Sequence, residues 1–144
     1  MKHVLIFMAL MFMVVGCTKN PVSANSGTLK YILSTAKKTY TADDTLHFTL
    51  TVRNTGFTTD TVATGDAILR KWSLKKASGS VIYSGEGPYG NMIGLSPIAP
   101  GESMVIDGWT HSLTDSTGNP LPTGSYTFAV DYSGNLASIA LSIK

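Results

Sequence analysis

The amino-acid sequence predicts an all-β protein, an immunoglobulin-like antiparallel β-sandwich of seven to eight strands with Greek-key connections. Short segments in which apolar and polar residues alternate recur along the chain, the pattern of strands with one buried face. Gly, Asn, Asp and Pro separate these segments, and no heptad, long repeat or strong helical pattern occurs. Because such strands bury their apolar faces only by packing sheet on sheet, a sandwich is the most economical architecture.

The composition limits the function classes. With 144 residues, the chain has room for one ordinary domain. Its 11 Lys and Arg against 9 Asp and Glu leave a formal net charge of +2, too small to predict a nucleic-acid partner. Cys17 is the single cysteine, which excludes an intramolecular disulfide and cysteine-based zinc sites. We therefore expect a fold stabilised by its hydrophobic core, with no metal and no small-molecule cofactor.

The N-terminal segment has the form of a bacterial signal peptide. A short positive start precedes an apolar run of residues 4–15, which is well below the roughly 20 residues that span a bilayer. The run ends in Val-Val-Gly16-Cys17, which resembles the lipobox of bacterial lipoproteins, with cleavage between Gly16 and Cys17 and lipid on the cysteine. The alternative is ordinary secretion with cleavage after Ala24. We predict a signal peptide at residues 1–16.

A polar segment, residues 17–27, follows and predicts a flexible tether of up to ~35 Å, since an extended residue spans about 3.3–3.6 Å. Lipid on Cys17 would hold the folded part, residues 28–144, on a membrane of the cell envelope. In lipoproteins an Asp after the cysteine resembles an inner-membrane retention signal. Thr18 stands there instead, which favours the periplasmic side of the outer membrane where the organism has one.

The first strands follow from the alternation of residue types. Residues 29–34 predict a strand that is partly apolar on both faces, and residues 46–53 predict the clearest strand of the chain. A turn signal begins at Asn54. Residues 58–64 are rich in Thr and poor in large apolar groups, so they predict an edge strand or an ordered loop.

A tight hairpin is predicted next. Residues 67–77 place Ile68, Trp72 and Leu74 on one face, although Arg70 interrupts that face, and a helix is the alternative for this segment. A Ser-Gly turn and an apolar segment at residues 81–83 make two antiparallel strands the more economical interpretation.

Residues 84–100 contain several Gly and Pro, which predicts a long loop without regular structure. Four large apolar residues lie in it: Tyr89, Met92, Ile93 and Leu95. We expect them to fold back and cap the core, and the alternative is that they are exposed recognition residues.

Residues 100–132 predict two strands joined by a polar hairpin loop. Ile106 and Trp109 have opposite parity, so if both face the core an extra residue must intervene, and the Gly at 108 favours a β-bulge at residues 107–108. Gly124 and Tyr126 have the spacing of a tyrosine corner. Alternation over residues 139–144 predicts the last strand.

The candidate chemical groups have simpler structural interpretations. His47 and His111 fall at outward positions of predicted strands and predict solvated surface groups rather than zinc ligands. Residues 43–44 and 114–119 carry Asp, Ser and Asn, which turn chemistry explains better than calcium binding. Trp72 and Trp109 predict core packing, with a ligand platform as the alternative. No nucleophile-elbow motif occurs, and we expect no catalytic residue.

Four segments in succession resemble the BsuPI-type intracellular proteinase inhibitor domain. They are residues 46–55, 79–83, 99–103 with the following Trp109, and 121–126. The resemblance extends over about residues 28–132 and implies an immunoglobulin-like fold and inhibition of serine proteinases. Its signature positions in this chain are Asn54, Tyr83, Pro100, Gly101, Glu102, Trp109, Gly124 and Tyr126.

The sequence predicts a membrane-anchored bacterial lipoprotein with a β-sandwich domain, and the resemblance implies that this domain inhibits a serine proteinase. From the composition of the loop at residues 85–97, and not from the family, we expect Met92 or Leu95 to enter an apolar specificity pocket. The alternative is a non-enzymatic envelope module that binds or assembles with another protein through a sheet edge or end loops.

Overall fold

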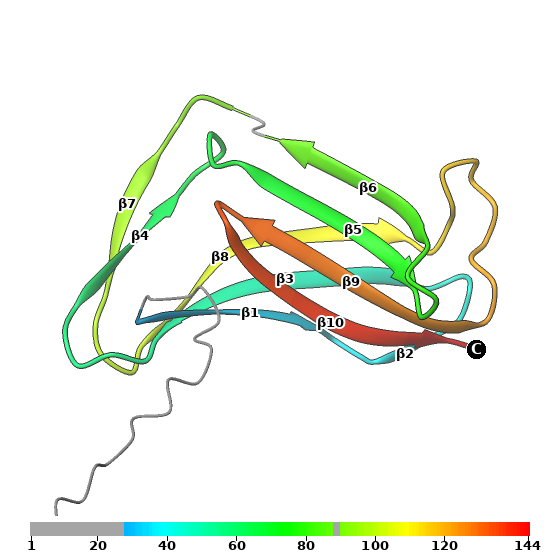
Figure 1. The fold of residues 1–144 in the computed structure, drawn as a ribbon, viewed down its shortest axis with the longest axis horizontal. Coiled ribbons are helices and arrows are strands. Elements are labelled where there is room, and N and C mark those ends of the chain that lie inside the picture. Colours follow the sequence, from blue (N-terminus) through cyan, green and yellow to red (C-terminus); the bar gives the residue numbers. More distant parts are fainter. Residues whose placement is uncertain (1–27, 88–89) are drawn as a thin grey trace, which may run out of the picture.

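The computed structural model describes residues 28–87 and 90–144, and these contain ten strands and no helix. The predicted lipidation site at Gly16 and Cys17, and also Tyr89, lie outside the described residues. In the part of the chain that is described, there is therefore no helix of the length and apolarity that a membrane span needs. The strands form two facing sheets and a separate two-stranded arm (Figure 1). In chain order they are β1 (Leu29–Thr35), β2 (Thr39–Tyr40), β3 (Thr45–Asn54), β4 (Asp60–Thr64), β5 (Arg70–Lys76), β6 (Val81–Gly87), β7 (Gly94–Ile98), β8 (Ser103–Ser112), β9 (Gly124–Tyr132) and β10 (Asn135–Ile143).

The first sheet has the order β1-β3-β8 and is antiparallel throughout. Its central strand, β3, is the one that the sequence predicts most clearly. The even positions of β3 are buried and most of the odd ones are more exposed, as period-2 alternation requires. The buried positions are Leu46, Phe48, Leu50, Val52 and Asn54.

The second sheet has the order β2-β10-β9-β5-β6, with the short β2 parallel to the end of β10. The predicted tight hairpin is present as β5 and β6. The two sheets meet through large side chains, among which Phe48 of β3 and Phe128 of β9 stack with ring centroids 3.8 Å apart. The fold is the predicted all-β, immunoglobulin-like sandwich, with more strands than the seven to eight expected.

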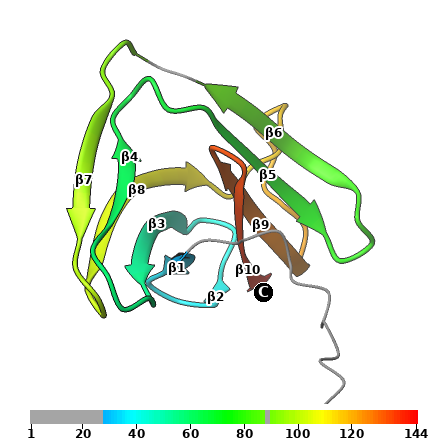
Figure 2. The ribbon, with the colours of Figure 1, turned by 60° about the vertical axis from the view of Figure 1, so that its left-hand side comes forward.

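The prediction of an irregular loop over residues 84–100 is wrong. β6 continues to Gly87, and β7 pairs antiparallel with β4 to form the arm, which Figure 2 shows as two strands side by side next to the main sheets. The Pro of this segment is compatible with a strand because Pro97 lies on an edge strand, where its missing N–H can point away from β4. Val62 and Ile98 of the arm are buried in a small cluster with Val52.

The predicted hairpin between the strands of residues 100–132 is also wrong. β8 belongs to the first sheet and β9 to the second, so their connection crosses from one sheet to the other. Buried Leu113 and Leu121 hold that connection, and the Leu121 N–H donates to the Leu113 carbonyl at 2.8 Å. Alternation identifies a strand with one buried face, but it contains no information about which strand is its neighbour.

A β-bulge interrupts β8, one residue before the predicted position. Leu50 lies opposite Asp107 and Thr51 lies opposite Val105, so Ile106 is the extra residue. After the bulge, Asp107, Trp109 and His111 lie opposite the inward-facing residues of β3. This single register shift determines which side chains of β8 face the interior.

Candidate functional site

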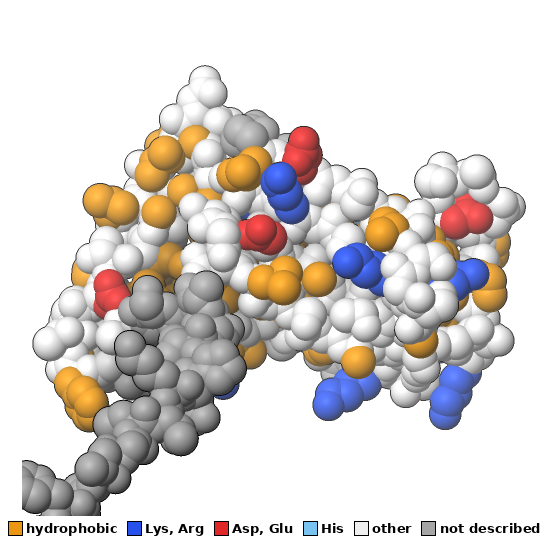
Figure 3. All heavy atoms as spheres, viewed as in Figure 1, with side chains coloured by type: hydrophobic (Ala, Val, Ile, Leu, Met, Phe, Trp, Pro, Cys, Tyr) orange, Lys and Arg blue, Asp and Glu red, His pale blue; other side chains and the backbone are white. Residues whose placement is uncertain are grey.

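Three large apolar side chains are exposed together on the arm and the turn before it. Met92, Ile93 and Leu95 are exposed by 75%, 64% and 73%, and we call them the apolar tip. Figure 3 shows hydrophobic side chains gathered over this part of the molecule. The expectation that they cap the core is wrong, because the core between the sheets is filled by residues of the strands themselves.

The backbone of the tip is held by the turn after β4. The Met92 N–H donates to the Asp66 carboxylate at 3.0 Å, and the Gly90 N–H donates to the Asp66 carbonyl at 3.1 Å. The Ala67 N–H donates to the Met92 carbonyl at 3.1 Å. Gly65 has φ of 110°, and a Cβ at this position would lie 2.3 Å from the Met92 carbonyl oxygen. The tip therefore presents its side chains from a fixed backbone.

The base of the arm is fixed by Asn54, which is completely buried. Its Nδ2 donates to the carbonyl of Thr58 at 2.7 Å and to that of Ile98 at 2.8 Å. Its Oδ1 accepts a hydrogen bond of 2.8 Å from the Gly56 N–H. One side chain thus joins the ends of β3 and β7 to the turn that leads into β4.

A turn of residues 99–102 completes the base of the arm. The Glu102 N–H donates to the Ala99 carbonyl at 3.1 Å, and Gly101 has φ of 78°, as position i+2 of a type II turn requires. Pro100 occupies position i+1 of the same turn. The Glu102 carboxylate accepts a hydrogen bond from the Ala99 N–H at 3.2 Å. These signature positions shape the scaffold of the arm.

The tyrosine corner lies at the start of β9, in the second sheet. The Tyr126 hydroxyl donates to the Pro122 carbonyl at 2.6 Å, as the sequence predicts, and burial raises the pKa of this hydroxyl. Gly124, with φ of 153°, begins β9 just before it. This contact fixes the entry of the chain into β9 and contributes no reactive group.

Aromatic side chains line the open side of the sandwich, where the edge strands β6 and β8 face each other. His47 is exposed as predicted, but the outward placement of His111 is wrong, because the bulge turns it to the side of Leu46. His111 stacks on Tyr83 with ring centroids 4.0 Å apart and planes 4° from parallel. Burial raises the pKa of the Tyr83 hydroxyl, which has no hydrogen-bond partner among the described residues.

The two tryptophans face inward, one from each sheet, and they line a cavity of about 140 Å³ between the sheets. They are half-buried and pack against the core, as the core interpretation predicts, yet they also form the walls of a hollow. The sequence signals for this arrangement were the predicted core packing of both tryptophans and the opposite parity of Ile106 and Trp109. The lining consists of Phe48, Trp72, Trp109, Thr110, His111 and Phe128.

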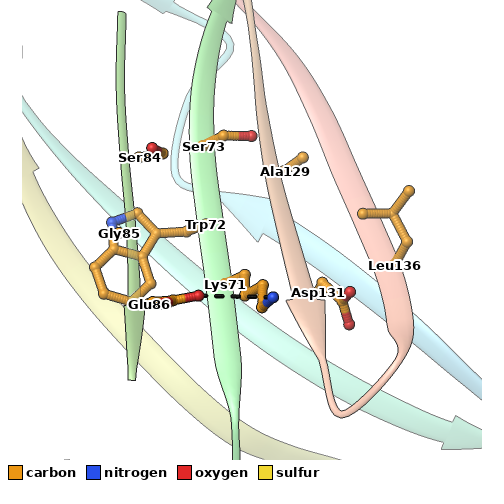
Figure 4. A pocket seen from close by; sticks show the side chains of 9 residues that line it. All are labelled: Lys71, Trp72, Ser73, Ser84, Gly85, Glu86, Ala129, Asp131 and Leu136. Atoms are coloured by element: carbon orange, nitrogen blue, oxygen red, sulfur yellow. Dashed lines mark ion pairs between the residues drawn. The ribbon is translucent and has the colours of Figure 1, made fainter. Parts of the chain in front are cut away.

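A larger and more open groove of about 470 Å³ lies on the outer face of the second sheet (Figure 4), and no pattern in the sequence predicts it. Ser73, Ser84 and Ala129 leave the sheet surface low at its centre. Lys71 and Glu86 border the groove as an ion pair of 3.6 Å across β5 and β6. Because both partners are exposed, this pair adds little stability and leaves no strong net charge at the groove.

The acidic residues in the turns act on the local backbone. The Asp115 carboxylate accepts a hydrogen bond from the Thr117 hydroxyl at 2.7 Å and from the backbone N–H groups of Asn119 and Thr117, both at 2.9 Å, and these bonds lower its pKa. A hydrogen bond and ion pair of 2.7 Å from Lys37, together with the Thr41 N–H, lowers the pKa of Asp44 to about 2. Residues 28–87 and 90–144 hold no group of three or more His, Cys, Asp or Glu side chains suited to a metal ion.

No protein-family model matches the chain, and a search of curated proteins found no significant match. Among solved structures, it is similar to a β-glucosidase, EmGH1, from Erythrobacter marinus, with 16% identity and a TM-score of 0.47 over 81% of this chain and 15% of that one. The CARDB domain of the PF1109 protein from Pyrococcus furiosus, in complex with di-metal ions, is similar over 81% of this chain and 87% of that one, with 11% identity and a TM-score of 0.43.

The alkylpurine DNA glycosylase AlkC from Pseudomonas fluorescens is similar with 10% identity and a TM-score of 0.47, over 82% of this chain and 31% of that one. This chain therefore spans only a small part of the two enzymes. At these identities and TM-scores, the similarities say nothing about activity, substrate or partner.

Proposed function

We propose that the chain is a non-enzymatic, protein-binding module of the bacterial cell envelope, held to a membrane by lipid on Cys17, and that it binds its partner through the apolar tip. The observation that supports this proposal is the combination of exposure and order at Met92, Ile93 and Leu95. Large apolar side chains held on a fixed backbone at the surface are typical of interaction sites.

Binding through the side chains of the apolar tip is energetically favourable. Burying one such side chain completely gains about 1.5–3 kcal/mol relative to leaving it exposed. The hydrogen bonds to Asp66 already order the backbone, so less conformational entropy is lost on binding. Pro97 supplies no N–H on the free edge of β7, which weakens any continuous strand addition there. The three side chains should therefore carry most of the affinity.

A serine proteinase is the partner class that the resemblance to BsuPI-type inhibitor domains supports. In that case Met92 or Leu95 would enter an apolar specificity pocket while the backbone stays fixed by the turn at Asp66. The proteinase would then be blocked without chemistry from this chain.

One structural observation favours the alternative, an envelope assembly module. Leu95 lies within β7 and pairs with Ala63 of β4, so it is part of a strand rather than of a loop that protrudes freely. An apolar side chain on a paired strand fits the face of another protein better than the narrow cleft of a proteinase. The two forms of the proposal share the binding surface and differ in the partner.

An inhibition assay separates them. The folded part, residues 28–144, would be titrated against subtilisin-like serine proteinases as wild type and as the variants Met92→Asp and Leu95→Asp. Val105→Asp is the matched control, since Val105 is an exposed apolar strand residue on β8, away from the tip. Inhibition by wild type and by the control, but not by the tip variants, supports the inhibitor form. Absence of inhibition by wild type at micromolar concentration overturns that form.

The assembly form is tested in the native membrane. Crosslinking through a photoreactive residue at position 93 should give one defined adduct, identified by mass spectrometry and lost in Leu95→Asp but kept in Val105→Asp. If the tip variants retain every adduct, the tip is not the binding surface and the whole proposal fails.

The anchor is tested separately. Fatty-acid labelling and membrane fractionation should give a lipid-modified, membrane-bound protein for wild type and neither property for Cys17→Ser. A mature N-terminus at residue 25 in the wild-type protein would instead establish ordinary secretion and refute the lipid anchor.

A further inference from the structure

The cavity between the sheets is lined mainly by aromatic side chains, which leave an unfilled space between them. Phe48 and Phe128 form its inner side as a stacked pair whose ring planes are 18° apart. Trp72 from the second sheet and Trp109 from the first sheet line it as well. A hollow of about 140 Å³ remains between these rings, although protein interiors normally leave few voids larger than a water molecule.

Gly85 makes room for one of these rings. A Cβ at this position would lie 2.2 Å from Cζ2 of Trp72, so any other residue would displace the indole. Figure 4 shows the indole lying across β6 at Gly85. The position of the Trp72 ring therefore depends on a residue without a side chain, which fixes one wall of the cavity.

His111 gives the cavity a defined polar group. Its Nδ1 contacts the carbonyl of Ser112, and because a carbonyl can only accept, this contact favours the tautomer in which Nδ1 carries the proton. In the neutral imidazole, Nε2 is then an acceptor. The stacked ring of Tyr83 holds the plane of the imidazole.

We propose that this cavity binds a small uncharged aromatic compound of one six-membered ring that carries a hydroxyl group, with the hydroxyl donating to Nε2 of His111. The volume is close to that of an engineered apolar cavity of about 150 Å³ that binds benzene. Aromatic walls favour a planar ring by stacking and edge-to-face contacts. A carboxylate is disfavoured because the lining holds no Lys or Arg side chain to offset its desolvation. This site is independent of the apolar tip and of the proposed function.

Phenol, benzene and benzoate are suitable probes, added to the folded part of the protein, residues 28–144. Trp72 and Trp109 are the only two tryptophans of the chain, so tryptophan fluorescence reports directly on the cavity. Phenol should change this fluorescence in a saturable way, benzene should bind about five-fold more weakly because it makes no hydrogen bond, and benzoate should not bind. A response to phenol that does not saturate, or equal binding of benzoate, overturns the proposal.

Two variants locate the site. His111→Phe keeps a flat ring but removes the acceptor, so it should weaken phenol about five-fold and leave benzene within two-fold. Phe57→Leu changes an almost completely exposed ring in the turn between β3 and β4 and should leave all three probes unchanged. Equal affinity for phenol in wild type and His111→Phe would refute the proposed hydrogen bond to Nε2 of His111. Should His111→Phe fail to fold, nuclear Overhauser contacts between phenol and the Trp109 ring in wild type decide, and their absence overturns the proposal.

Discussion

Replacing Asn54 with alanine should destabilise the folded domain by about 3–5 kcal/mol. The side chain is completely buried at the base of the arm and makes three hydrogen bonds to backbone groups. Alanine removes all three and leaves the carbonyls of Thr58 and Ile98 and the N–H of Gly56 without these partners.

The magnitude follows from these three bonds. A hydrogen bond within a protein contributes about 0.5–1.5 kcal/mol net, so three contribute about 3 kcal/mol. A group left unsatisfied where water cannot reach it costs about 1–3 kcal/mol instead. The bond to Ile98 is the fully buried one of the three, which raises the expected total toward 5 kcal/mol. Asn54→Asp should be worse at neutral pH, because it directs a carboxylate at two carbonyl oxygens.

Urea unfolding of the folded part, residues 28–144, followed by circular dichroism, measures the free energy of unfolding directly. Asn119→Ala is the control, because Asn119 is exposed and its side chain donates only to Thr117; we expect at most about 0.5 kcal/mol there. Burial beside two carbonyl oxygens raises the folded-state pKa of the introduced carboxyl, so Asn54→Asp should recover part of its loss as the pH falls toward about 4, because the protonated carboxyl can donate one hydrogen bond. A loss below about 1 kcal/mol in Asn54→Ala would contradict the stabilising role of these three hydrogen bonds.

Three further changes test other contacts. Tyr126→Phe removes the hydrogen bond of the tyrosine corner and should cost about 1 kcal/mol in urea unfolding; an unchanged midpoint would contradict this. Arg70 of β5 forms a largely buried ion pair with Asp107 of β8. Arg70→Met leaves the carboxylate of Asp107 beside an apolar group and should cost about 3–5 kcal/mol, most of which Arg70→Met with Asp107→Leu recovers, a result that a double-mutant cycle measures. The folded-state pKa of Asp44 is about 2, below its ordinary 3.8, so its pairing with Lys37 stabilises the fold above about pH 4 and is lost as the pH falls through about 2. Asp44→Asn should therefore lose less stability than wild type between pH 4 and pH 2, and parallel pH profiles would refute it.

Strands and turns were predictable because they are local. The alternation in β3 and β9 determines which residues are buried whatever the neighbouring strand is. The tyrosine corner was predictable for the same reason, since Tyr126 bonds to a carbonyl only four residues away. The parity of Ile106 and Trp109 even predicted that the register of β8 must break.

Pairing between distant segments was not predictable from one sequence. The Gly and Pro content of residues 84–100 predicts a loop, but β7 forms because residues 60–64 supply a partner strand and Ile98 finds buried Val52 and Val62. The side chains of the tip therefore lie on the arm instead of on the core. Arg70 was a visible interruption of the inward face of β5, but its partner Asp107 lies on the other sheet and is reached only after the bulge.

The bulge at Ile106 links the features that matter most for function and stability. Met104 faces inward opposite Val52, and without an extra residue the alternation from Met104 would turn Gly108 and Thr110 inward. Trp109 and His111 would then point to solvent, and the cavity would lose two of its lining side chains. Asp107 would also leave the interior, and Arg70 would lose that partner. One inserted residue in an edge strand thus determines both the aromatic cavity and the buried ion pair, which is why the position of the bulge, more than any single side chain, defines the chemistry of this side of the sandwich.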